Sequence, residues 1–190
     1  MSAQGKLVYL IGPPASGKST LMAHLRAGYE AVPRKGSVPH ILLTDPRYGD
    51  TQGIEIGALR DKFSGTDALR MDIHPHACEW IKTTQWPLVL AEGARLATRA
   101  FLTAAAAQYE VHLAHLSAPD AVLDARCEQR ASTQSPTWRR GAASRARNLA
   151  DWSVEQPWIT LHRLNSTSPT PLLAAALRQA AGLTGRNDQR

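Results

Sequence analysis

The chain has 190 residues, of which 43% are hydrophobic, and a formal net charge of +6. This length and apolar content suffice for one sizeable core, so we expect a single domain over residues 1–190 with a polar tail at 182–190. No apolar stretch approaches the roughly 20 residues of a membrane span, and the opening MSAQGK lacks the features of a signal peptide. We therefore expect a soluble, cytoplasmic protein that does not bind membranes.

Apolar runs that suit buried strands alternate with helical patterns along the chain. The strands are expected at 6–11, 40–44, 87–91, 111–116 and 158–164, and the helices at 18–27, 75–84, 98–108, 121–131, 144–152 and 171–181. Such alternation is typical of an α/β fold with a parallel sheet covered on both faces. We predict a five-stranded, mainly parallel sheet. Residues 47–71 and 133–143 fit neither pattern and are predicted to be binding loops or a lid.

The first expected strand leads into a phosphate-binding motif. Residues 12–19 read GPPASGKS, which matches G-x-x-x-x-G-K-[ST] between a strand and a helix and predicts a three-layer sandwich of the P-loop NTPase type. Backbone N–H groups at a helix N-terminus bind polyphosphate, but a proline has none to donate. The nucleotide-binding residues are therefore expected to be Gly12, Ala15, Ser16, Gly17, Lys18, Ser19 and Thr20. Lys18 should contact the β and γ phosphates of ATP, and Ser19 should ligate Mg²⁺.

Two acids follow expected strands and are candidates for the chemistry. Asp45 comes directly after the strand at 40–44, and Glu92 follows the strand at 87–91. Ligands of such sheets bind at the carboxyl ends of the strands, so both acids should face Lys18 in one cleft. One would position or deprotonate an acceptor hydroxyl and the other would hold Mg²⁺ through water, with Glu92 and Ser19 as the metal candidates. Arg47 and Arg95 could bind acceptor phosphates. Alternatively, each acid caps a helix or anchors a loop.

Positive charge is concentrated within the carboxyl-terminal half of the chain. Six arginines and one acid lie between residues 126 and 147. Such a field favours phosphate-bearing partners, nucleic acid included, although a solvated basic surface is the alternative. We predict a lid at about 126–150, built as a helix, a basic loop at 137–141 and a second helix. Lid arginines would neutralise charge on the transferred phosphoryl group, with Arg139 and Arg145 as first candidates.

The motifs resemble those of a known group of enzymes. The sequence GPPASGKST, the ending AEG at 91–93 and the arginine-rich lid are similar to the nucleoside and nucleotide kinase branch of P-loop proteins. The segments KFSGTDAL at 62–69, SPTW at 135–138 and ARNLA at 146–150 resemble bacteriophage P-loop kinases related to thymidylate kinase. The resemblance implies transfer of the γ-phosphate of ATP to the hydroxymethyl group of 5-hydroxymethyluracil in DNA, an early step in thymine hypermodification. It also implies a DNA partner, no obligate protein partner, and the host cytoplasm as the location.

The same resemblance directs attention to the segment at 62–69. Phe63 could stack on a pyrimidine, while Ser64, Thr66 and Asp67 could read its edge, and the target base would have to leave the stack. A polar turn with Phe63 in the core is the alternative. Trp138 could stack on a base or pack within the lid. Thymidylate kinases carry an Asp-Arg pair where this chain has Glu92-Gly93-Ala94-Arg95, which argues against free thymidine monophosphate as the substrate.

Two other activities are compatible with the motifs. A kinase for a free nucleoside, nucleotide or other small alcohol would use the same ATP site. A P-loop ATPase that acts as a switch or motor is less well supported, because the chain has no recognisable sensor region or second domain.

Overall fold

The computed structural model describes residues 5–58 and 65–183, in which seven strands form one sheet. The order across the sheet is β2-β3-β4-β5-β1-β6-β7. The strands β4, β5, β1, β6 and β7 pair in parallel. At one side of the sheet, β3 pairs antiparallel with β4, and β2 pairs antiparallel with β3. The predicted α/β class is confirmed, with seven strands in place of five. The strands are β1 (Gly5–Ile11), β2 (Glu30–Arg34), β3 (His40–Thr44), β4 (Thr51–Ile56), β5 (Leu88–Glu92), β6 (Tyr109–Ser117) and β7 (Ile159–Asn165).

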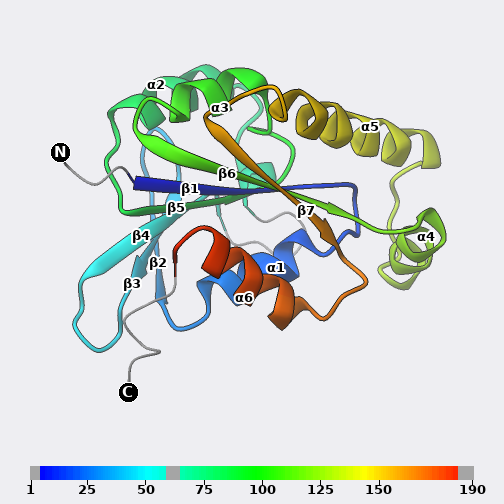
Figure 1. Ribbon diagram of the computed structural model, residues 1–190, viewed down its shortest axis with the longest axis horizontal. Coiled ribbons are helices and arrows are strands. Elements are labelled where there is room, and N and C mark those ends of the chain that lie inside the picture. The colour runs from blue at the N-terminus through cyan, green and yellow to red at the C-terminus, as the bar shows by residue number, and fades with distance from the viewer. Residues whose placement is uncertain (1–4, 59–64, 184–190) are drawn as a thin grey trace.

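Helices cover both faces of the sheet (Figure 1). One face carries α2 (Ile73–Thr83), α3 (Arg99–Ala105) and α5 (Pro136–Ser153), and the other carries α1 (Lys18–Arg26) and α6 (Thr170–Ala180). The short helix α4 (Asp120–Gln129) lies beside α5 at the end of the molecule to which β6 leads. A three-layer arrangement results, as predicted. Within the described ranges, no helix is long and apolar enough to cross a membrane.

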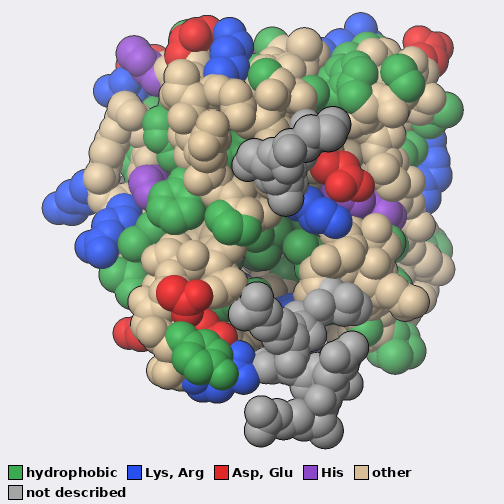
Figure 2. All heavy atoms as spheres, turned by 60° about the vertical axis from the view of Figure 1, so that its left-hand side comes forward, with side chains coloured by type: hydrophobic (Ala, Val, Ile, Leu, Met, Phe, Trp, Pro, Cys, Tyr) green, Lys and Arg blue, Asp and Glu red, His purple; other side chains and the backbone are tan. Residues whose placement is uncertain are grey.

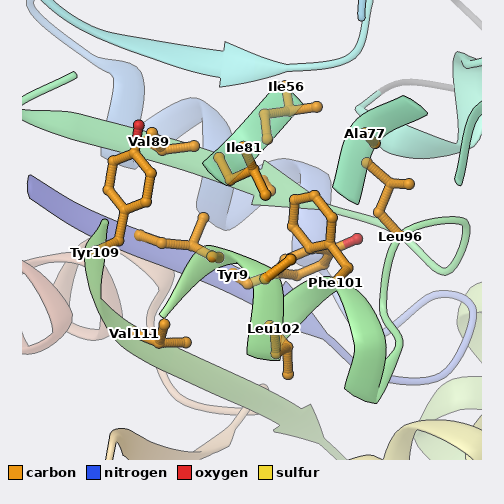
Figure 3. Close-up of a cluster of buried hydrophobic side chains, with 14 of the residues drawn as sticks. Tyr9, Ile56, Ala77, Ile81, Val89, Leu96, Phe101, Leu102, Tyr109 and Val111 are labelled. Carbon is orange, nitrogen blue, oxygen red and sulfur yellow. The ribbon is translucent and has the colours of Figure 1, made fainter. Parts of the chain in front are cut away.

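Two buried clusters hold the layers together. The first lies between the sheet and α2, α3 and α5, and Figure 3 shows its aromatic and aliphatic side chains packed around Tyr9 and Phe101. The rings of these two residues meet edge-on, with their centroids 6.1 Å apart. The second cluster lies under α1 and α6 and includes Leu10, Leu116 and Leu177. Because neighbouring residues of β1 face opposite clusters, the central strands are apolar throughout, which is why the sequence pattern identified them.

Two strands, β2 and β4, were missed by the sequence reasoning. Both interrupt an apolar pattern: β2 contains Pro33 and is largely exposed, and β4 contains Gly53 and Glu55. Gly53 is needed because β5 passes close by; a Cβ at this position would lie 2.5 Å from the backbone oxygen of Leu88. The segment at 47–71, predicted to be irregular, therefore contains β4, an inner strand of the sheet between β3 and β5.

The direction of β3 overturns the predicted position of Asp45. β3 pairs antiparallel with β4, while β4 pairs parallel with β5. Thr44, at the end of β3, pairs with Thr51, at the start of β4. The carboxyl end of β3 therefore lies at the edge of the sheet opposite the carboxyl end of β5. The prediction that Asp45 and Glu92 share one cleft is wrong, and Arg47, in the same hairpin turn as Asp45, lies at that opposite edge too.

The predicted helix break at 137–141 is also wrong, because these residues form the first turns of α5. The Ser135 side chain accepts a hydrogen bond of 3.2 Å from the backbone N–H of Trp138, and Pro136 occupies the first turn. Both are established signals for a helix start. Of the predicted lid, the two helices are present as α4 and α5, and the connection between them is the segment 130–135.

Candidate active site

The motif at 12–19 forms a tight loop between β1 and α1. Gly12 is required by a close approach, since a Cβ there would lie 2.5 Å from the backbone oxygen of Leu116. Gly17, with φ at 86°, adopts the left-handed conformation directly before α1. The first N–H groups of α1, including those of Ser19 and Thr20, have no partner within a helix and carry its positive dipole end. The loop therefore presents a helix N-terminus to an anion, as predicted from the motif.

Lys18 lies across this loop. Its Nζ donates hydrogen bonds to the backbone oxygens of Gly12, at 3.0 Å, and Pro13, at 2.9 Å. Burial lowers the pKa of Lys18, the carboxylates of Glu92 and Asp67 raise it, and Arg130 lowers it. Glu92, Asp67 and Arg130 therefore lie near Lys18 at the carboxyl edge of the sheet. Lys18 is half-buried in the loop, and its ammonium group is suited to bind polyphosphate oxygens.

Ser19 and Glu92 meet at the same edge. The Ser19 hydroxyl donates a hydrogen bond of 2.8 Å to Oε1 of Glu92, which is 3% exposed and ends β5. Leu10, two residues before the loop, pairs with Glu92 across β1 and β5. A hydroxyl and a carboxylate are oxygen ligands of the kind that Mg²⁺ takes in nucleotide-binding sites, where phosphates and water complete its shell. These two residues thus fit the predicted metal role.

The residues at 65–67 lie against the loop that follows β5. The Thr66 hydroxyl donates to the backbone oxygen of Glu92 at 2.9 Å. Oδ1 of Asp67 accepts from the backbone N–H groups of Ala94, at 2.8 Å, and Arg95, at 3.0 Å. The Arg95 guanidinium donates to the backbone oxygen of Asp67 at 3.3 Å. Thr66, Asp67 and Arg95 are therefore brought to Glu92, where the side chains of Thr66 and Asp67 act as loop anchors.

The other predicted acceptor residues have different surroundings. Phe63 and Ser64 lie outside the described residues. Trp138 is 46% exposed in the first turn of α5. Asp45 and Arg47 bind each other, with Arg47 Nη2 2.7 Å from Oδ2 of Asp45, and the Arg47 side chain holds the pKa of Asp45 below its usual range. This pair closes the turn between β3 and β4, at the edge of the sheet opposite Glu92.

The lid arginines differ in their partners. Arg139 Nη1 lies 2.9 Å from Oδ1 of Asp124, so this ion pair ties α5 to α4. Arg145 is exposed on α5. Among the described residues, neither arginine has a recorded contact with residues 12–20, and their catalytic roles stay predictions.

A cleft of about 250 Å³ opens beside the P-loop on the α1 and α6 side of the sheet. Arg126 of α4 spans it: Nη1 donates to the Ser166 hydroxyl at 3.1 Å and to the backbone oxygen of Ala15 at 3.4 Å, while Nη2 donates to the backbone oxygen of Ser166 at 2.9 Å. A nucleoside next to the bound phosphates would lie here. Other lining residues are Gly17, Thr20, Leu116, Arg130 and Thr170.

Sequence reasoning did not assign Arg126, Arg130 or Ser166 to this cleft. Arg126 and Arg130 lie four residues apart and so share a face of α4. Nothing local, however, shows that α4 brings Arg126 to the P-loop or that the segment after β7 brings Ser166 there.

Comparison with known proteins agrees with this geometry. An unliganded sugar kinase from Janibacter sp. HTCC2649 is similar in fold, with a TM-score of 0.56 and 13% sequence identity over 95% of this chain and 96% of that chain. No curated protein matches the chain. The model of one family, P-loop Nucleotide Kinase3, matches residues 3–174. Because this match covers most of the chain, the chain belongs to the P-loop Nucleotide Kinase3 family.

Proposed function

We propose that this protein is an ATP-dependent kinase that transfers the γ-phosphate to the hydroxymethyl group of 5-hydroxymethyluracil in DNA. The observation that carries the kinase part is the convergence of Lys18, Ser19 and Glu92, with the Ser19 hydroxyl 2.8 Å from the Glu92 carboxylate beside a helix N-terminus. In the reaction, the acceptor oxygen bonds to the γ-phosphorus, the bond to the β-γ bridging oxygen breaks, and ADP leaves.

The residues of the chain supply positioning and charge for this transfer. The N–H groups at the start of α1 and the Lys18 ammonium would bind the phosphates, and Ser19 and Glu92 would hold Mg²⁺. Mg²⁺, when bound, neutralises phosphate charge. Arg130, whose charge already acts on Lys18, would add a second cation near the phosphates. Arg126 would hold the nucleoside side of the cleft together by bridging Ala15 and Ser166.

Four features support a polymer acceptor such as DNA: exposed arginines, an exposed tryptophan, the position of α5 and the sequence resemblance. Arg140, Arg145 and Arg147 are exposed on α5, and Trp138 stands at its start. This helix lies at the end of the molecule to which the carboxyl ends of β1 and β6 lead (Figure 1). On the side shown in Figure 2, by contrast, basic and acidic side chains are interspersed. A basic helix at this end of the molecule is suited to bind the phosphate backbone of DNA. The segments at 62–69, 135–138 and 146–150 add the resemblance to kinases of this base.

A free nucleoside, nucleotide or other small alcohol is the second candidate acceptor. Arg95 favours it, because its backbone and guanidinium groups bind Asp67 next to Glu92 and so bring a cation to the acceptor side of the site. A protein of similar fold is a sugar kinase, and this likeness supports a small acceptor. Membership of a nucleotide kinase family disfavours the third alternative, an ATPase that acts as a switch or motor.

The acceptor is tested by incubating the protein with γ-³²P-labelled ATP and parallel acceptors. These are DNA with thymine, DNA with 5-hydroxymethyluracil, free nucleosides and free monophosphates. Label in the hydroxymethylated DNA alone is the expected result, and label in a free nucleoside or monophosphate alone would reassign the acceptor. Lys18→Ala serves as the control and should abolish labelling while leaving the circular dichroism spectrum intact.

DNA binding provides a separate test. Affinity for hydroxymethylated DNA should fall steeply with salt, because each neutralised phosphate releases counterions. Replacing Arg140, Arg145 and Arg147 with Gln should flatten this salt dependence. Wild-type protein that shows no salt-dependent DNA affinity would support a small acceptor instead.

A further inference from the structure

His115 is a buried histidine at the edge of the sheet that binds phosphate. It is 8% exposed and lies two residues before the end of β6. It pairs with Ile11, the last residue of β1 before the P-loop, and with Arg163 of β7. Within residues 5–58 and 65–183, its ring has no recorded hydrogen-bond partner. Among the described residues, the fully buried side-chain nitrogens that lack a hydrogen-bond partner belong to His112 and Arg139. The ring nitrogens of His115 therefore keep some access to solvent, and an incoming polar group can reach them.

The side chain of His115 faces the α5 side of the sheet. Side chains alternate along a strand, and Leu113, two residues earlier, belongs to the cluster that α5 covers. Leu116, the next residue, faces the opposite way and lines the nucleotide cleft. His115 and Leu116 are consecutive residues of β6, so their side chains lie on opposite sides of the sheet beside the strand that leads into the P-loop.

This placement separates a nucleotide side from an acceptor side. In phosphoryl transfer, the attacking and leaving oxygens lie roughly in line on opposite sides of the γ-phosphorus. The nucleoside cleft occupies the Leu116 side. An acceptor therefore approaches from the other side, where Thr66 and Asp67 lie next to Glu92 and where α5 overlies His115.

Charged groups surround the ring on this side. Arg147 and Asp151 of α5, Arg163 of β7 and Lys18 at the start of α1 all act on its protonation. Burial, followed by the charge of Arg163, lowers the pKa of His115, and the charges of Arg147 and Lys18 act in the same direction, while Asp151 opposes them. Asp151 is held by Arg163 at 2.8 Å. The ring is therefore neutral at neutral pH and can accept a hydrogen bond from a hydroxyl group.

We propose that His115 is an acceptor-binding residue that orients the hydroxyl group receiving the phosphate, an inference that rests on the proposed kinase function. Sequence patterns alone place it in a strand interior. Two structural facts bring His115 close to the P-loop on the acceptor side: its pairing with Ile11 and the side of the sheet that its ring faces.

The test compares His115→Leu and His115→Gln in steady-state transfer to whichever acceptor of the panel takes up label. His115→Leu should raise the KM for the acceptor roughly tenfold, as expected for one lost hydrogen bond, and should change the KM for ATP much less. His115→Gln, which keeps a polar group, should recover part of the loss. In the wild type, kcat/KM for the acceptor should fall as the pH drops and the ring is protonated, and this acid limb should vanish in His115→Gln.

His112→Gln is the matched control. His112 is a buried histidine on the same strand, but it faces the other side, where Nδ1 lies 3.1 Å from Nε2 of His162. Its replacement should leave the KM for the acceptor unchanged. Unaltered acceptor KM and pH profile in both His115 variants would overturn the inference.

A spectroscopic measurement separates this inference from the proposed function. The imidazole resonance of His115, assigned by its loss in His115→Gln, should shift when hydroxymethylated DNA or a free nucleoside is added to protein holding a non-hydrolysable ATP analogue. The analogue alone should not cause this shift. If no acceptor takes up label, the proposed function fails, yet a shift on acceptor addition would still support His115 as its contact. Absence of any shift would overturn the role of His115.

Discussion

The Ser19 hydroxyl donates a hydrogen bond of 2.8 Å to Oε1 of Glu92, and this bond joins the first turn of α1 to the carboxyl end of β5. The two groups come from segments more than 70 residues apart, since the bond spans 73 positions of the chain. Their meeting places the two proposed Mg²⁺ ligands next to Lys18, so this pair is the first target for mutation.

Glu92→Gln is expected to lower kcat by roughly two to three orders of magnitude, because a charge that would hold Mg²⁺ in the transition state is lost. Initial rates measured over a range of Mg²⁺ concentrations test this. Ser19→Ala should shift the Mg²⁺ dependence to higher concentrations, whereas Ser19→Thr, which keeps the hydroxyl, should not. Wild-type Mg²⁺ dependence in Glu92→Gln would remove the pair from the mechanism.

Asp45→Asn should leave kcat and the KM of both substrates unchanged. The carboxylate of Asp45 lies in the β3–β4 turn, at the edge of the sheet opposite Glu92, and binds Arg47. The change should act only on the turn, where the backbone N–H of Arg47 also donates to Asp45 at 2.9 Å. Steady-state kinetics of the two variants, Asp45→Asn and Glu92→Gln, measured side by side give the contrast. A kinetic defect in Asp45→Asn comparable to that of Glu92→Gln would contradict the placement.

Arg126→Ala should weaken binding of an ATP analogue roughly tenfold, because the bridge between Ala15 and Ser166 is lost. Arg126→Lys should recover only part of the affinity, since an ammonium cannot reproduce the planar fork of the guanidinium. Calorimetric titration measures both. Arg140→Ala is the control: this exposed residue of α5 lies outside the cleft lining, and its loss should not change nucleotide affinity. Equal affinity in Arg126→Ala and the control would exclude Arg126 from nucleotide binding.

Arg26→Ala should destabilise the fold by about 3 kcal/mol at pH 7. Arg26 Nη1 lies 2.6 Å from Oε2 of Glu55, whose side chain is 1% exposed, so the change leaves a buried carboxylate without its cation. Urea unfolding measures the loss. The double variant Arg26→Ala with Glu55→Gln should regain much of the stability, because the unpaired charge is gone.

The loss in Arg26→Ala should also depend on pH. Burial raises the pKa of Glu55 above its usual range, so the folded protein takes up this proton at a higher pH than the unfolded chain does. As the pH falls through the raised pKa, the folded state gains stability relative to the unfolded state. Removing Arg26 raises this pKa further, and the deficit of the variant should therefore be smaller at pH 5 than at pH 7. An equal deficit at both values would contradict this assignment.

Local features of the chain were enough to predict the nucleotide side of the site. The motif at 12–19 determines the shape of its loop locally, because Gly12 and Gly17 permit the turn and Lys18 directly follows Gly17. The doubly buried strands were equally clear from their apolar runs. The start of α5 was signalled too, by Ser135 and Pro136, although residues 137–141 were predicted to be a loop.

The acceptor side depended on relations that no local pattern contains. The apolar run of β3 is the same whether the strand runs parallel or antiparallel to its neighbour. Because β3 is antiparallel to β4, Asp45 lies at the edge of the sheet opposite Glu92. Arg126 of α4 meets Ser166 in the cleft beside the P-loop, because the segment after β7 brings Ser166 to that place. The chain by itself determined the P-loop and the layered core, since these arise from short-range backbone geometry and apolar periodicity. Tertiary structure alone decided which side chains meet beside the P-loop, because strand direction and register are properties of pairs of distant segments.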